Sequence, residues 1–98
     1  MITRVVKMHF RKEAVSDFLL HFDKHKNAIR QQPGCQLLVL YQDVEIPEIF
    51  FTYSFWDTEK HLNLYRKTAL FTEVWAYTKT LFKEKPLAWS LTEIHKLP

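Results

Sequence analysis

Lys7 and His9 are the first residues along the chain that could take part in proton transfer. They are two positions apart in a short β-branched segment, so a strand there would point both side chains to the same side. Burial favours the uncharged, proton-accepting form of such groups, and a cation can also stabilise a substrate oxyanion. The alternative is that this side of the strand meets solvent or the edge of a partner. Lys7 and His9 are therefore candidates for a base or an oxyanion partner.

Trp56 is the candidate for binding an aromatic molecule. It ends the segment 48–56, which is dense in aromatic and β-branched residues and is predicted to be a strand. An indole at a strand end can line a cavity and stack on an aromatic substrate, or it can simply fill the core. The residue type and position leave both interpretations open.

The histidines and the single cysteine do not predict a metal site. Only His21 and His25 have the i, i+4 spacing of a ligand pair, and no third ligand is in view. Both, like His61, stand near lysines at helical positions, which favours solvated helix faces. Cys35 is alone, so an internal disulfide is excluded and a small buried side chain is expected.

The elements that must position these residues are expected in the order β-α-β-β-α-β. Strands are predicted at 2–10, 35–42, 48–56 and 88–97; one helix runs from Arg11 to a stop at Pro33-Gly34, and a second follows the Asp57-Thr58-Glu59 turn with a break at Thr68-Ala69. The 98 residues suit a single domain over 1–98.

Both sides of the predicted third strand carry apolar or aromatic residues. Ile49, Phe51, Tyr53 and Phe55 point one way, and Phe50, Thr52, Ser54 and Trp56 point the other. Two helices joined by short connections cover only one face of a four-stranded antiparallel sheet. Something else must cover the second face, and a second copy of the chain in a homodimer is the simplest choice.

Composition argues against nucleic-acid and membrane partners. The net charge of +3 is mild, and the basic residues are interspersed with acidic ones rather than gathered in a stripe. RNA-recognition modules share this element order, but Pro47-Glu48 stands where their basic third-strand motif begins, and the acidic loop would repel phosphates. No apolar run could span a bilayer, and the start of the chain is unlike a signal peptide, so a cytoplasmic protein is expected.

The chain resembles the antibiotic biosynthesis monooxygenase family. The resemblance lies in Pro33-Gly34-Cys35 before the second strand, Tyr53-Ser54-Phe55-Trp56 at the end of the third, and the acidic turn Asp57-Thr58-Glu59 that opens a helix reaching Phe71. It implies an α+β ferredoxin-like sheet that forms a dimeric α+β barrel. It also implies oxidation of a small aromatic or quinol-like substrate, without metal or flavin, in a cavity between sheet and helices.

The resemblance also suggests site residues. Polyketide-oxidising members accompany the strand-end Trp with an Asn four residues earlier and a Tyr six residues later; here these places hold Thr52 and Leu62. Thr52 can still donate a hydrogen bond to an oxyanion, whereas Leu62 cannot exchange a proton. Tyr65 stands where members often place a cavity-facing His, and its phenol could donate a proton or fill the core instead.

The haem-degrading branch is matched less well. Its Asn, Trp and axial His correspond to Lys7, Tyr65 and Trp75, so no iron ligand is evident and haem degradation is not expected. Trp75 is then a substrate-binding or core residue. The prediction is a cofactor-independent monooxygenase with Trp56, Tyr65, Lys7 and His9 as catalytic candidates and Thr52 and Trp75 as substrate-binding ones. The alternative is a member of the same family that binds a small molecule without catalysis.

Overall fold

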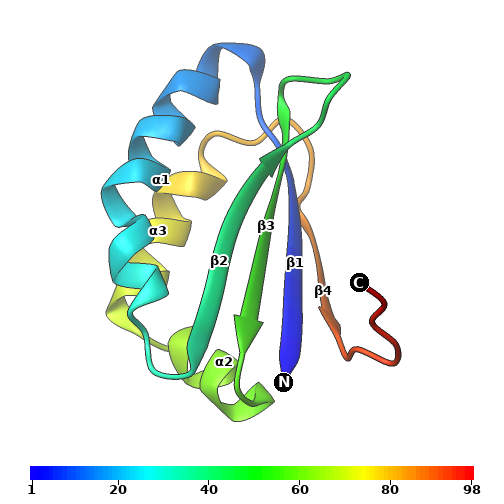
Figure 1. Cartoon of the computed structure of the whole chain (residues 1–98). Helices are drawn as coiled ribbons and strands as arrows, with labels where there is room; N and C mark the ends of the chain where they lie inside the picture. Colours follow the sequence, from blue (N-terminus) through cyan, green and yellow to red (C-terminus); the bar gives the residue numbers. More distant parts are fainter.

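The structure, a computed structural model, describes all 98 residues and has one antiparallel sheet with helices on one of its faces (Figure 1). The elements are β1 (Ile2–His9), the 3₁₀ turn η1 (Lys12–Ala14), α1 (Val15–Arg30), β2 (Cys35–Gln42), β3 (Ile49–Trp56), α2 (Glu59–Tyr65), α3 (Ala69–Lys79) and β4 (Leu87–Leu91). This order confirms the predicted β-α-β-β-α-β arrangement and the ferredoxin-like fold.

The strands lie in the order β2-β3-β1-β4, and all neighbours are antiparallel. Helices α1 and α3 lie side by side over one face of the sheet, and the short α2 sits at the end where β3 finishes (Figure 1). The sheet face that meets the helices carries the even-numbered residues of β1 and β3. Side chains alternate along a strand, so the odd-numbered residues lie on the face without helices.

The break predicted at Thr68-Ala69 is confirmed, because α2 and α3 are separate helices. Each begins at a threonine cap: the Thr58 hydroxyl accepts a hydrogen bond from the His61 amide at 3.2 Å, and the Thr68 hydroxyl accepts one from the Phe71 amide at 3.1 Å. Thr68 also donates to the Tyr65 carbonyl at 2.7 Å, which ties the end of α2 to the start of α3.

The single glycine sits at a turn that needs it. Gly34 has a φ of +82°, a backbone region that side chains with a Cβ atom disfavour, and it follows α1 as predicted. Its carbonyl accepts a hydrogen bond from the Asp57 amide at 2.8 Å. The turn before β2 is thereby fixed to the residue that follows β3.

The core lies between the sheet and the helices. Phe10 is fully buried and contacts Phe18 of α1, with ring centroids 4.1 Å apart, and Phe50 of β3 at 5.9 Å. A second cluster holds Cys35, Trp56 and Leu62. The expectation that Cys35 is a small buried residue is confirmed.

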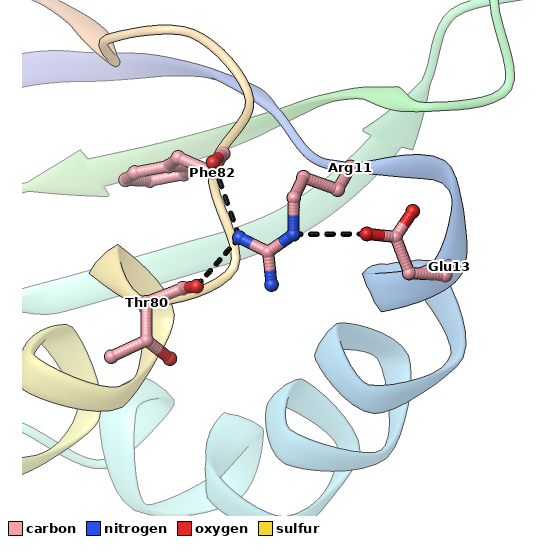
Figure 2. A network of polar contacts seen from close by, with 4 residues as sticks. All are labelled: Arg11, Glu13, Thr80 and Phe82. Atoms are coloured by element: carbon pink, nitrogen blue, oxygen red, sulfur yellow. Dashed lines mark hydrogen bonds and ion pairs between the residues drawn. The ribbon is translucent and has the colours of Figure 1, made fainter.

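Arg11 joins the start of the helical layer to the end of α3 (Figure 2). Its Nη1 donates to the carbonyls of Thr80 at 2.8 Å and Phe82 at 3.4 Å, and its Nε pairs with Glu13 Oε1 at 3.1 Å. The Arg11 amide also donates to the Leu81 carbonyl at 3.1 Å. These bonds hold the two chain segments that close one end of the layer between α1 and α3.

The last strand is shorter than predicted. The sequence pattern favoured a strand over 88–97, whereas β4 covers only Leu87–Leu91. The reason lies in its neighbour: β4 pairs with β1 alone, and Leu91 is opposite Thr3, near the beginning of β1. Residues after Leu91 would run past the end of β1, so they have no strand to bond, and the chain turns away from the sheet (Figure 1).

The helices are too short or too polar for a bilayer: none has the length and apolar character that crossing a membrane requires.

Candidate functional site

A cavity of about 240 Å³ lies between the helix-facing side of the sheet and the helices. From β1 and β3 it is lined by Arg4, Val6, Met8, Thr52, Ser54 and Trp56, and from the helices mainly by aromatic, aliphatic and histidine side chains. No Asp or Glu lines it. Its volume is slightly below the roughly 300–1,000 Å³ of typical small-molecule sites, so a small ligand suits it better than a large one.

One side of the cavity is an aromatic wall of four residues, Trp56, Tyr65, Phe71 and Trp75. Neighbouring rings touch in sequence: Trp56 and Tyr65 are stacked with centroids 5.0 Å apart, Tyr65 and Phe71 meet edge to face at 5.3 Å, and Phe71 and Trp75 are stacked at 6.1 Å. The wall combines the end of β3 with α2 and α3. Such a surface can bind the face or edge of an aromatic ligand.

Trp56 forms the back of the aromatic wall rather than its surface. It is 1% exposed, its Nε1 donates to Ser54 Oγ at 3.0 Å, and Tyr65 covers one of its faces. Tyr65 is only partly buried and therefore offers more surface to the cavity. Trp56 accordingly holds Tyr65 in place.

Burial, and secondarily the neighbouring Cys35, raises the pKa of Tyr65 to about 12. The phenol therefore keeps its proton at neutral pH and can donate a hydrogen bond, but it is a poor base. Thr52 also lines the cavity and is partly buried, with a hydroxyl that can donate to a ligand oxygen.

His21 and His25 line the cavity as well, although the sequence favoured solvated positions for them. His21 Nε2 lies 3.0 Å from the Val74 carbonyl, and His25 Nδ1 lies 2.9 Å from the His21 carbonyl. A carbonyl only accepts, so these two nitrogens carry the protons. In its neutral form His25 then has its lone pair at Nε2, and His21 has it at Nδ1. Each ring thus keeps one nitrogen without a hydrogen-bond partner in the protein.

Lys7 and His9 lie away from this cavity. They pair with Phe51 and Ile49 of β3, on the sheet face that has no helices. The structure therefore brings together Thr52, Trp56, Tyr65 and Trp75, and separates them from the other two candidates. The same-side placement of Lys7 and His9 holds, but that side is opposite the cavity.

The residues that the sequence prediction missed were detectable by spacing. His21 and His25 continue the helical stripe of Phe18, Phe22 and Ile29, at intervals of three and four residues. Arg4 and Ser54 share strand parity with Trp56 through the Arg4–Ser54 pairing. The helical spacing of His21 and His25 indicated a buried position, but the nearby lysines favoured the prediction of a solvated helix face.

Comparison with known proteins identifies the family. The model of the antibiotic biosynthesis monooxygenase family matches residues 1–76. The chain belongs to this family. No curated protein matches the sequence.

Solved structures of other proteins share the family's fold with this chain. A crystal structure of an antibiotic biosynthesis monooxygenase is similar with a TM-score of 0.91 and 18% identity, over 97% of this chain and 100% of that one. A conserved protein from Methanosarcina mazei Go1 has a TM-score of 0.87 and 22% identity over 93% and 91% of the chains. Rv0793 from Mycobacterium tuberculosis has a TM-score of 0.89 and 14% identity over 99% and 98%. At these identities the likeness shows the fold.

Proposed function

We propose that the chain is a monooxygenase that oxidises a small aromatic or quinol-like substrate in the cavity between sheet and helices, without a cofactor. The observation that carries the proposal is the cavity itself, in which an aromatic wall faces side chains that can donate and accept protons. Membership of the monooxygenase family supports the reaction class. The fold alone would not.

In the proposed reaction, a phenol or anthrone lies along Tyr65, Phe71 and Trp75 of the aromatic wall. His25 Nε2 removes the proton of the phenol hydroxyl or of the anthrone CH₂ group, because its Nδ1 is engaged with the His21 carbonyl. Thr52 and Tyr65 donate hydrogen bonds to the oxyanion that forms, and the pKa of Tyr65, raised by burial to about 12, keeps that donor protonated. Trp56 positions Tyr65 through their stacked rings.

The substrate carbanion supplies the electrons for the reaction with oxygen. It passes one electron to O₂, and the resulting substrate radical and superoxide combine to form a C–O bond. The peroxide takes up the proton held by the imidazolium and then loses water, leaving a carbonyl. For an anthrone, the CH₂ group plus O₂ thus gives C=O plus H₂O. For a phenol, the C–OH group and a ring C–H plus O₂ give the two C=O groups of a quinone plus H₂O. In both cases one atom of O₂ ends in each product.

The site departs from the polyketide-oxidising pattern at Leu62, which is 3% exposed and cannot exchange a proton. Under the proposal the proton is transferred by His25, which lies on a different element, α1. The second candidate function, binding of a small molecule without catalysis, is favoured by this same replacement. Oxygen uptake distinguishes the two.

We also propose that the active form is a homodimer joined through the sheet face without helices. That face carries aromatic and aliphatic residues, among them Tyr41 at 53% exposed and Trp89 at 43%, with Tyr53 and Phe55 between them on the sheet. An apolar surface of this extent on a single chain is typical of an interface. The family resemblance points to the same two-sheet barrel.

The decisive experiment measures oxygen consumption by the metal-free protein with anthrones and dihydroxynaphthalenes. We expect uptake that depends on the protein and falls at least about tenfold in His25→Asn, which keeps a donor to the His21 carbonyl but has no basic nitrogen. Tyr65→Phe is expected to lower kcat by a smaller factor. His95→Asn, the same substitution at an exposed histidine after β4 that does not line the cavity, is the matched control and should retain full activity.

Two results would contradict the proposal. Absence of uptake from a folded dimer that still binds the aromatic compounds would favour the non-catalytic function. If His25→Asn is as active as the wild-type protein, His25 is not the base.

The dimer is tested by sedimentation equilibrium. Tyr53→Asp should give a folded monomer, whereas Leu20→Asp, at an exposed apolar position of α1, should leave the dimer intact. If the wild-type protein is a monomer at micromolar concentration, the proposed dimer interface is wrong.

A further inference from the structure

All residues at the cavity that can carry a charge at neutral pH are basic. Arg4 and Arg66 both line it, His21 and His25 are its other groups able to carry a positive charge, and no Asp or Glu is present. Neither arginine forms an ion pair, since the two ion pairs of the chain are Arg11–Glu13 and Lys26–Asp23. An apolar cavity with an uncompensated pair of cations favours a ligand with a negative charge.

The two guanidinium groups have donors to spare. Their only hydrogen bond is from Arg4 Nη1 to Ser90 Oγ, at 3.0 Å. A guanidinium has five N–H donors, so most donors of the pair have no protein partner. Burial, followed by repulsion from Arg66, lowers the pKa of Arg4. An anion between them would relieve this repulsion.

Both arginines lie at the same end of the aromatic wall. Arg66 directly follows Tyr65 in the chain, and Arg4 pairs across the sheet with Ser54, whose hydroxyl accepts the hydrogen bond from Trp56. The charged end of a ligand held there would leave its rings against Tyr65, Phe71 and Trp75.

We propose that the cavity selects an aromatic carboxylic acid, whose carboxylate binds between Arg4 and Arg66 while its rings lie along the aromatic wall. Arginine matches a carboxylate with two parallel hydrogen bonds, which a neutral phenol cannot provide. The inference rests on the proposed function only in taking this cavity as the substrate site. It adds the substrate class and the end of the cavity at which the acid group binds.

The test is a binding measurement that needs no turnover. Two probes, 1-hydroxy-2-naphthoate and 1-naphthol, share the same rings and differ in the carboxylate, and their affinities are measured by isothermal titration calorimetry. We expect the acid to bind at least about tenfold more tightly, given the strength of hydrogen bonds between charged groups. Raising the salt concentration should reduce this preference, since the arginines stand at a partly exposed end of the cavity.

Variants assign the preference to the two arginines. Arg4→Gln and Arg66→Gln should each weaken binding of the acid about five- to tenfold and leave binding of 1-naphthol unchanged. Lys67→Gln removes the same charge next to Arg66 but does not line the cavity, and should have no effect. Ser90→Ala removes the hydrogen bond to Arg4 while keeping its charge, and should preserve the selectivity.

Equal affinity of the two probes, or failure of both to bind, would overturn the inference. So would a preference for the acid that persists in both arginine variants, or one that Lys67→Gln abolishes equally. These outcomes are independent of oxygen uptake: turnover of neutral anthrones without acid preference would leave the proposed function standing and remove the carboxylate site. Selective binding of the acid without any oxygen uptake would support the carboxylate site and contradict the proposed function.

Discussion

Replacing Gly34 with alanine should destabilise the fold and displace α2. The added Cβ atom would lie 2.5 Å from the Cβ atom of His61 and closer still to its ring. Rotating the His61 side chain relieves only the ring contact, because the His61 Cβ is fixed by the helix backbone. The ring is also held by a hydrogen bond of 2.7 Å between its Nδ1 and the Thr58 hydroxyl. The helix itself must therefore move.

Three contributions set the magnitude of the effect. A residue with a Cβ atom at the φ of +82° costs about 1–2 kcal/mol. The overpacking against His61 adds about 1–3 kcal/mol. Alanine also lowers the conformational entropy of the unfolded chain, which stabilises the folded state by about 0.4–1 kcal/mol. The expected net loss for Gly34→Ala is about 1–5 kcal/mol in the free energy of unfolding.

A double-mutant cycle separates the contact from the backbone strain. His61→Gly removes all three atoms that the new Cβ would meet, so Gly34→Ala in that background should cost about 1–3 kcal/mol less than it does alone. The assay is urea unfolding at a fixed protein concentration, followed by tryptophan fluorescence. Strict additivity of the two substitutions would refute the contact argument, and a neutral Gly34→Ala would refute both parts of it.

Three further predictions concern pH, helix capping and the core. The folded-state pKa of Tyr65 is about 12 against an ordinary 10, so the unfolded chain loses this proton first, and stability is complete below pH 10 and declines by about 2–3 kcal/mol as the pH rises to 12. Urea titrations at several pH values should show this decline reduced in Tyr65→Phe, and parallel curves for the two proteins would contradict it. Thr68→Ala should cost about 1 kcal/mol by removing the cap of α3, while Thr68→Ser should restore most of it; equal losses in chemical denaturation would count against the cap. Phe10→Ala, at a fully buried ring, should lower the thermal stability by about 3–5 kcal/mol, whereas Leu20→Ala, at a residue 71% exposed, should change it by less than about 0.5 kcal/mol; similar effects of the two would contradict the burial.

Most of the fold could be predicted from local signals. The β-branched and aromatic runs predicted the strands, and the Thr68-Ala69 break lies where α2 and α3 are separated. The Pro33-Gly34 pair predicted the end of α1 to within a few residues, since α1 ends at Arg30. These signals are short-range, since caps, turns and periodicity depend on residues within a few positions of one another. The end of β4 could not be predicted in this way, because it depends on where β1 begins.

The candidate site could be predicted only in part. Thr52 and Trp56 share a side of β3, and both line the cavity as the alternation of a strand requires. Lys7 and His9 also share a side, but both sides of β3 are apolar, so alternation alone did not tell which side the helices cover. The sequence therefore did not decide which face of the sheet borders the cavity, and Lys7 and His9 lie on the other face.

The sequence by itself determined the elements, their order and the presence of two apolar sheet faces, because periodicity and composition are properties of neighbouring residues. Only the tertiary structure decided which face the helices cover, and that decision joined His25 of α1, Arg4 of β1 and Arg66 after α2 to one aromatic wall. These residues come from separate elements and have no common sequence signal. Their meeting depends on how helices pack on a twisted sheet, which sets the site only once the whole chain has folded.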